Sequence, residues 1–558
     1  MKLLKKILVA IGLLIVLLIT IYYFKVRIVP PEVGNEQTNA ANISEKEGIY
    51  RSENGSWLKE NDKGLWEMYI QGTPYESGVA FGALAGKSGL MAEKEAAFVS
   101  EIKNKVPSPI YLNFLKYMVG WLNRDLDDYV PHEYLLEIYG SSKYMPDEYD
   151  YIAPKFHRAL SYHAAHDIGH ALQNMNLVGC TSFATWNDES DGNKLLIGRN
   201  FDFYFGQDFA KDKIVAFYKP DSGYQFMSVT WACFSGVVSG MNEKGLTITL
   251  NSAKSAIPTK GKTPVSLIAR QILQYAKNID EALAIAEKHE SFVAETFLIG
   301  SKEDNKVGLI EKTPEKTALF MSDNNEMVVT NHFQSEELRN DPLNKEYEAE
   351  GVSDYRFDRV KQMIDSLAPM SPADMVTILR NRDGLDGEKI GLSNEKAVNQ
   401  LIAHHSVVFS PTDMIAWVSA PPYNLGAYVA YDLNEIFNST DHNFTYSDSL
   451  SLASDPFLAT EKYAGYENFM DIKERIQNYL YSGNGNKLTK EEIEKFIADN
   501  PNGFLTYYYL GDYSFKQKEY AEAIKYYEIG LTMVIARESE RKHMESRITE
   551  AQTLMDND

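Results

Sequence analysis

Apolar residues form one long uncharged run near the N-terminus, at residues 7–24. Basic residues flank this run, with Lys2, Lys5 and Lys6 before it and Lys25 and Arg27 after it. At about 1.5 Å per residue, a helix of this length crosses the hydrocarbon layer of a membrane. The alternative is a cleaved signal peptide, but residues 21–26 contain no small-x-small cleavage site. We therefore expect residues 1–27 to be an uncleaved single-pass signal anchor, with the rest of the chain outside the cytoplasm.

In the middle of the chain, short runs of small, β-branched and aromatic residues alternate with turn-forming residues. Residues 180–186 form one such run, and residues 187–193 are crowded with Asp, Ser, Gly and Asn. A second predicted strand follows at residues 196–202. This alternation predicts a β-hairpin that returns the end of its second strand to Cys180.

Two further apolar strands are each predicted to end in an asparagine. A turn at residues 240–246 precedes a strand that ends at Asn251, and a later β-branched strand ends at Asn331. A helix is expected to begin at Ser353. Side-chain amides at strand ends can donate hydrogen bonds to a developing oxyanion, so both asparagines are candidate site residues.

The regions on either side of these strands have other patterns. Residues 28–48 are polar and are expected to be a linker, and residues 49–179 contain amphipathic stretches. Residues 438–485 are interpreted as a second polar linker. Residues 486–558 predict helices whose apolar spacing resembles a tetratricopeptide unit. This segment is either a helical cap on the rest of the chain or a surface for a protein partner.

Composition narrows the class of protein. The chain has 558 residues, a formal net charge of -22 and a pI of about 5.1. Such an acidic chain is a poor partner for a polyanion, so we expect no nucleic acid binding. With 44% hydrophobic and 12% aromatic residues, the chain is expected to fold into a globule.

Candidate chemistry centres on Cys180, which follows Gly179. A thiolate is the nucleophilic form of cysteine, and it requires a cationic neighbour and a proton acceptor. The predicted hairpin brings Arg199 and Asp202 beside the sulfur. If the Gly179-Cys180 bond were cut, the new α-amine of Cys180 would titrate near neutrality and could act as the general base. The alternative is a structural cysteine, either buried or paired with Cys233.

Three histidines precede this hairpin, at His163, His166 and His170. The last two have the i, i+4 spacing of a zinc-protease helix. The sequence offers no evident third ligand, and Gly169 weakens the helix. We therefore expect neither a metal nor a cofactor.

Several motifs occur together in the order found in one known family. They are Gly72-Thr-Pro-Tyr-Glu-Ser-Gly78 with Gly82, Gly179-Cys180-Thr181, Gly198-Arg-Asn-Phe-Asp202, Met241-Asn-Glu-Lys-Gly-Leu246, Thr330-Asn-His-Phe333, and Ser406-Val-Val-Phe-Ser-Pro411 followed by Ala420-Pro-Pro422. Over residues 67 to 430 the chain resembles the acyl-CoA:6-aminopenicillanate acyltransferases (C45 autoproteolytic acyltransferases and hydrolases) and, more distantly, the choloylglycine hydrolases. Both are N-terminal-nucleophile (Ntn) hydrolases.

This resemblance implies a fold and a set of roles. The fold would be α+β, a four-layer αββα sandwich, carried here between an N-terminal transmembrane helix and a helical extension. Residues 49–179 would be the smaller chain, cut from the catalytic domain (180–437) at Gly179-Cys180. Cys180 would attack an amide or thioester carbonyl, and Arg199 and Asp202 would tune it.

The resemblance also points to residues further along the chain. Asn331 matches an oxyanion position firmly and Asn251 loosely. Arg356 is expected as a more distant active-site arginine, and Arg359, one helical turn on, is the alternative.

The expected function is that of an exported cysteine amidohydrolase that cleaves the linear amide of a small acylated amine. Export separates the domain from cytoplasmic CoA, which favours hydrolysis over acyl transfer. One alternative is an acyltransferase that uses acyl-CoA or another acyl donor. The other is a catalytically idle scaffold whose helical tail binds a protein partner.

Overall fold

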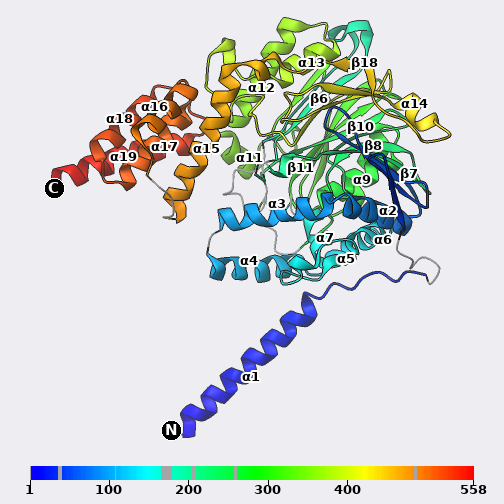
Figure 1. Cartoon of the computed structure of the whole chain (residues 1–558), viewed down its shortest axis with the longest axis horizontal. Helices are drawn as coiled ribbons and strands as arrows, with labels where there is room; N and C mark the ends of the chain where they lie inside the picture. Colours follow the sequence, from blue (N-terminus) through cyan, green and yellow to red (C-terminus); the bar gives the residue numbers. More distant parts are fainter. Residues whose placement is uncertain are drawn as a thin grey trace.

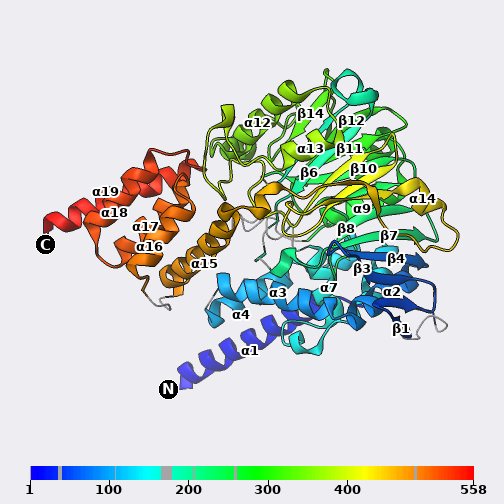
Figure 2. The ribbon, with the colours of Figure 1, turned by 45° about the horizontal axis from the view of Figure 1, so that its top comes forward.

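The computed structural model describes residues 2–34, 41–106, 108–164, 167, 179–203, 205–206, 208–254, 256, 261–482 and 487–557. Within them, two sheets are stacked face to face with helices on their outer sides (Figures 1 and 2). The mixed helix and sheet composition expected from the sequence is confirmed.

The larger sheet has eleven strands. In spatial order they are β1 (Ile43–Lys46), β2 (Ile49–Ser52), β3 (Trp57–Glu60), β4 (Trp66–Gly72), β7 (Ile214–Pro220), β8 (Phe226–Thr230), β9 (Ser239–Asn242), β10 (Leu246–Ser252), β11 (Glu295–Ser301), β12 (Lys306–Lys312) and β13 (Thr317–Phe320). Neighbouring strands are antiparallel except β4 and β7, which run parallel and join the N-terminal region to the rest of the sheet.

The smaller sheet has seven strands and carries the predicted hairpin. In spatial order they are β14 (Glu326–Val329), β5 (Thr181–Thr185), β6 (Leu196–Phe201), β15 (His405–Ser410), β16 (Ile415–Ser419), β17 (Tyr428–Asp432) and β18 (Ser447–Leu452). Ser182 pairs with Arg199 across β5 and β6, so the predicted hairpin forms.

Three apolar layers hold the sandwich together. Side chains from both sheets form the middle layer, as Phe217 and Val418 illustrate. Helices α2 (Pro74–Lys87), α6 (His132–Ser142), α9 (Val265–Tyr275) and α10 (Ile279–Lys288) cover the larger sheet. Helices α12 (Val352–Leu367) and α13 (Pro372–Leu379) cover the smaller one. Because helices and the facing sheet cover both sides of each sheet, the central strands β6 and β11 are buried at every position.

The remaining described helices lie around this sandwich. They are α3 (Leu90–Lys105), α4 (Pro109–Leu122), α5 (Leu126–Tyr129), α7 (Lys155–His163), α11 (Pro342–Glu348) and α14 (Leu433–Asn438). The 3-10 turns are η2 (Asp147–Tyr149), η3 (Asn187–Glu189), η4 (Asp191–Asn193), η5 (Asp208–Ala210), η6 (Leu385–Gly387) and η7 (Pro456–Ala459).

Helix α1 (Lys2–Lys25) extends away from the rest of the protein, and its C-terminal end is the part that lies near it (Figure 1). Residues 3–25 are long and apolar enough to cross a membrane, and none of the most apolar window is buried in the protein. A membrane span and a signal sequence both fit this helix.

The C-terminal part of the chain is helical, with α15 (Glu461–Ser482), α16 (Lys490–Asp499), α17 (Phe504–Lys516), α18 (Tyr520–Leu531) and α19 (Glu538–Asn557). It packs on the sandwich, since Arg537 Nη2 lies 2.7 Å from a carboxylate oxygen of Glu395. Leu401 and Leu425 join its apolar cluster.

Both linker predictions are wrong over part of their length. Residues 438–485 contain β18, which pairs with β17, and the long helix α15. Residues 28–48 contain β1, which pairs with β2. Both β1 and β18 are edge strands, each paired with one other strand. Their polar side chains can therefore face solvent.

Candidate active site

The hairpin places Cys180 one residue before β5, with its side chain completely buried. Gly179 N donates to the carbonyl oxygen of Asp202 at 2.9 Å, which closes the open end of the hairpin. Cys180 and Cys233 are both free thiols, so the disulfide alternative is wrong.

Arg199, on β6, lies beside the nucleophile. Its Nη2 donates to Cys180 Sγ at 3.6 Å and to the carbonyl oxygen of Leu250, and its Nη1 donates to the carbonyl oxygen of Val238 at 3.0 Å. Burial raises the pKa of the Cys180 thiol to about 11, and the Arg199 charge opposes that rise. In the continuous chain the thiol is therefore protonated near neutral pH and needs a base to react.

Asp202 follows β6 and is completely buried. Burial raises its pKa to about 7, and the charges of Arg356 and Arg199 partly offset this effect. Its Oδ2 accepts a long hydrogen bond from Gln400 Nε2 at 3.5 Å, while its Oδ1 has no hydrogen-bond partner among the described residues. A buried carboxylate oxygen without a donor is costly, so this atom can receive a cationic group formed nearby.

Arg356, on α12, lies closer to the nucleophile than expected. Its Nη1 donates to the Cys180 carbonyl oxygen at 2.6 Å and to Thr181 Oγ1 at 2.8 Å. Arg359 instead donates to Asn381 and Gln362. The expectation that Arg356 stands further out is therefore wrong, because α12 packs directly on β5 and β14.

Asn331 is joined to this centre through Arg356, whose Nη2 donates to Asn331 Oδ1 at 2.7 Å. Asn331 Nδ2 donates to both the carbonyl and hydroxyl oxygens of Ser252 at 2.9 Å. Asn251 lies on the neighbouring strand, where its Oδ1 accepts from Ser182 Oγ at 2.6 Å and its Nδ2 donates to the Val329 carbonyl oxygen. Both amides are buried close to the hairpin, and their role as oxyanion donors stays a prediction.

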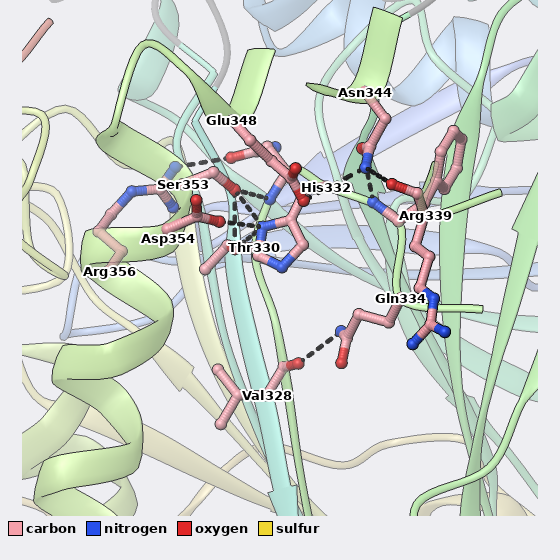
Figure 3. Close-up of polar contacts among 12 residues, drawn as sticks. Val328, Thr330, His332, Gln334, Arg339, Asn344, Glu348, Ser353, Asp354 and Arg356 are labelled. Carbon is pink, nitrogen blue, oxygen red and sulfur yellow. Dashed lines mark hydrogen bonds and ion pairs between the residues drawn. The ribbon is translucent and has the colours of Figure 1, made fainter. Parts of the chain in front are cut away.

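A hydrogen-bonded group behind Asn331 fixes its backbone (Figure 3). Ser353 Oγ accepts from Asn331 N at 2.8 Å and lies 2.9 Å from both Thr330 Oγ1 and His332 Nδ1. Burial lowers the pKa of His332 to about 4, so its imidazole is neutral near pH 7. Sequence reasoning missed Ser353 as a site residue because nothing in the sequence places it beside Asn331.

His332, Glu348 and Asp354 could hold a metal ion, since their ligand atoms lie within 4.8 Å of one another. Each already has a protein partner. Asp354 Oδ1 lies 3.3 Å from His332 Nδ1, and Glu348 Oε2 lies 2.5 Å from Lys345 Nζ. Lys345 supplies a positive charge beside Glu348, whereas His332 is neutral near pH 7 and supplies none to Asp354. His166 and His170 of the zinc interpretation lie outside the described residues, and His163 is buried, with its Nε2 accepting from Ser235 N.

Glu295, at the start of β11, is an acidic residue that sequence reasoning missed. It is completely buried, and burial raises its pKa well above its usual value. When it is ionised, its charge also raises the pKa of Cys180. Its register partner on β10 is Ser252, the residue that accepts from Asn331. An acidic residue inside an apolar strand is the one signal that could have drawn attention to it.

An aromatic cavity is connected to Arg199 through two buried histidines. Ser239 Oγ accepts from Arg199 and contacts His405 Nε2 at 2.9 Å, and His405 Nδ1 lies 3.0 Å from His404 Nδ1. The His404 ring lies 5.0 Å from the ring of Trp231, which lines the cavity. Phe98, Tyr162, Phe203, Phe209 and Phe234 complete its aromatic wall.

The chain is similar in sequence to one curated protein. An uncharacterized protein from Archaeoglobus fulgidus is 24% identical over 282 residues, which are 48% of this chain and 47% of the relative. The chain thus matches about half the length of that curated relative.

Two solved structures are similar over most of their own length. The Caenorhabditis elegans ortholog of N-acylethanolamine-hydrolyzing acid amidase has 17% identity and covers 42% of this chain and 93% of its own, with a TM-score of 0.31. A mutant of the conjugated bile acid hydrolase from Clostridium perfringens has 14% identity and covers 48% and 95%, with a TM-score of 0.33.

A family model, acyl-coenzyme A:6-aminopenicillanic acid acyl-transferase, matches residues 187–422. The match begins after Cys180 and includes Arg199, Asp202, Asn331 and Arg356. The resemblance to this family that the ordered motifs predicted is thus confirmed as a match over residues 187–422.

Proposed function

We propose that this protein is a membrane-anchored, extracytoplasmic, self-processing Ntn hydrolase that cleaves the linear amide bond of an acylated amine through a Cys180 acyl-enzyme. The match of residues 187–422 to the family model supports amide cleavage or acyl transfer as the reaction class. The stacked sheets with outer helices fit the αββα arrangement of such enzymes.

One observation carries the proposal. Two completely buried arginines converge on Cys180, Arg199 at its sulfur and Arg356 at its carbonyl oxygen, beside a buried carboxylate with an unpartnered oxygen. Burying charges is expensive, and a core without chemistry would be more stable with apolar side chains at these positions. The arrangement therefore favours an enzyme over an idle scaffold.

Maturation comes first in this proposal. Cys180 Sγ attacks the Gly179 carbonyl carbon, and the peptide bond is exchanged for a thioester as the Cys180 nitrogen leaves and takes up a proton. Water then hydrolyses the thioester, which yields a Gly179 carboxylate and a free Cys180 α-amine. Asp202 Oδ1, on the neighbouring strand, can accept a hydrogen bond from that amine when it is protonated.

In turnover, the α-amine takes the thiol proton, and the thiolate attacks the substrate amide carbonyl. Asn331 and Asn251 are the proposed donors to the oxyanion that forms. The amine product leaves with the proton, and water hydrolyses the thioester to release the acid. We propose an apolar acyl group because Trp231 and Phe234 belong to the same buried apolar cluster as Cys180.

Acyl transfer to an amine acceptor is the second candidate, since the matched family is named for it. We favour hydrolysis because the proposed anchor separates the domain from cytoplasmic CoA.

Intact-mass analysis of the purified full chain tests this function. We expect two fragments that meet at Gly179 and Cys180, and a single unsplit chain for Cys180→Ala. Acyl amides and acyl-CoA esters are then assayed with both preparations. An active protein that remains one chain would overturn the mechanism, and turnover confined to acyl-CoA with an amine acceptor would favour the transferase.

A further inference from the structure

Helix α4 has an apolar stripe that the protein does not cover. Ile110, Phe114, Tyr117 and Trp121 recur at helical spacings of four, three and four residues and are 85%, 58%, 50% and 40% exposed. No residue of α4 is buried. A single exposed apolar side chain is ordinary, but a continuous stripe of four marks a surface that contacts something else.

The end of α1 lies against this same helix (Figure 2). Tyr22 Oη donates to the Tyr117 carbonyl oxygen at 2.8 Å, and the Tyr22 ring stacks on Trp121 with 6.1 Å between centroids. Gly120 permits this approach, because a Cβ there would lie 3.0 Å from the Tyr22 hydroxyl.

The globular part holds the end of α1 in place. Ile28 is buried, and its backbone carbonyl oxygen lies 2.8 Å from His157 Nε2. The position of α1 relative to α4 is therefore set by contacts at Tyr22 and, further along the chain, at Ile28.

These contacts fix the depth of α4. If the apolar run at residues 7–24 fills the hydrocarbon layer, Tyr22 stands at its outer boundary, where tyrosine and tryptophan concentrate in membrane proteins. Tyr117 and Trp121 touch Tyr22, so they lie at the same level.

Basic side chains accompany the stripe. Arg124 stacks on the Trp121 ring at 4.4 Å, and Lys116 Nζ donates to the carbonyl oxygen of Tyr151, whose ring is itself exposed. Aromatic and aliphatic side chains on one face with lysine and arginine beside them are typical of a helix that lies in the interface of a bilayer.

We propose that α4 is a second membrane contact, a helix that lies in the outer lipid interface with Ile110, Phe114, Tyr117 and Trp121 among the headgroups and upper acyl chains. This inference rests on the part of the proposed function that makes α1 a retained membrane span. One span alone would let the catalytic domain rotate, whereas span and interfacial helix together fix its orientation.

The test uses the full chain in phosphatidylcholine vesicles, with single cysteines introduced at exposed positions and labelled with an environment-sensitive fluorophore. Phe114→Cys and Ile110→Cys report on α4, Ile15→Cys on α1, and Leu450→Cys on β18, which lies far from α1 in Figure 1. The parent chain, whose two cysteines are buried, gives the labelling background.

We expect nitroxide-bearing lipid to lower fluorescence at positions 110 and 114 by about twofold or more, with little change at 450. Aqueous iodide should quench the label at position 450 more strongly than the labels at positions 110 and 114. Lipid quenching at 15 without quenching at 110 and 114 would overturn the α4 proposal and leave the anchor intact. Loss of quenching at 15 as well would overturn the anchor. If neither nitroxide-bearing lipid nor iodide quenched the labels at positions 110 and 114, a protein surface would cover α4 instead of lipid. That result would also overturn the proposal.

Discussion

The centre around Cys180 and the surface formed by α1 and α4 have opposite distributions of side chains. Charged groups are completely buried at the centre, with Arg199, Arg356 and Asp202 at 0% exposure. On the other surface, large apolar side chains such as Ile110 and Phe114 are open. Each arrangement lowers stability in water, which supports the proposed chemistry in the first region and the proposed lipid contact in the second.

The largest loss of stability is expected when a buried arginine is removed from the centre around Cys180. Arg356→Met leaves the Cys180 carbonyl oxygen and Asn331 Oδ1 without their charged donor. Hydrogen bonds to charged groups contribute about 1.5–3 kcal/mol each, so we expect a loss of about 3–5 kcal/mol in the free energy of unfolding, together with loss of chain splitting. Urea unfolding and intact mass measure the two effects.

Arg359→Met is the matched control for this variant. Arg359 lies one turn further along α12, and its side chain donates hydrogen bonds to Asn381 and Gln362. It should cost about 1 kcal/mol and leave splitting intact. If the control fails to split and Arg356→Met splits normally, the assignment of the two arginines is reversed.

Asn331→Ala should affect turnover more than maturation. Removal of one oxyanion donor lowers turnover by about 10² to 10³, which corresponds to about 2.7–4 kcal/mol. Steady-state assays on an acyl amide, with splitting followed by mass, check this. Unchanged kcat would remove Asn331 from the catalytic residues and leave it as a contact between Arg356 and Ser252.

The burial of Asp202 predicts a pH dependence in the unsplit Cys180→Ala chain. Burial raises its pKa from 3.8 to about 7, so the folded state binds this proton more tightly than the unfolded state. Its stabilising contribution is present at low pH and is lost as the pH rises towards 7. The slope is at most about 1.4 kcal/mol per pH unit.

Asp202→Asn in the same background cannot titrate, so the fall in unfolding free energy between about pH 5 and pH 7 should become smaller by up to about 3 kcal/mol. Urea unfolding at a series of pH values measures it. Identical slopes for the two chains would show that Asp202 is ionised throughout this range.

The smallest effect belongs to the exposed surface. Ile110→Gln should change the free energy of unfolding by no more than about 0.5 kcal/mol, because the side chain has almost no protein contacts to lose. Ile138→Val, in the buried part of α6, is the comparison and should cost about 0.5–1.5 kcal/mol although it removes only one methyl group. A larger loss at Ile110 would mean that α4 is covered by protein.

The sequence by itself determined the local features of the site. The turn-rich residues 187–193 between two predicted strands were enough to predict the hairpin, since neighbouring strands joined by a turn pair locally. The start of α12 and the strand preceding Asn331 followed from the same kind of pattern. Arg199 could therefore be placed beside Cys180 without the structure.

Only the tertiary structure decided what meets across the layers. Arg356 reaches the Cys180 carbonyl oxygen, and Glu295 lies opposite Ser252, because elements far apart in the chain pack together. The same reason explains the strand β18 in a segment interpreted as a linker. A periodic pattern shows which side chains avoid water, as in α4, but not what covers them. For α2 the cover is the larger sheet, whereas α4 is left open beside α1.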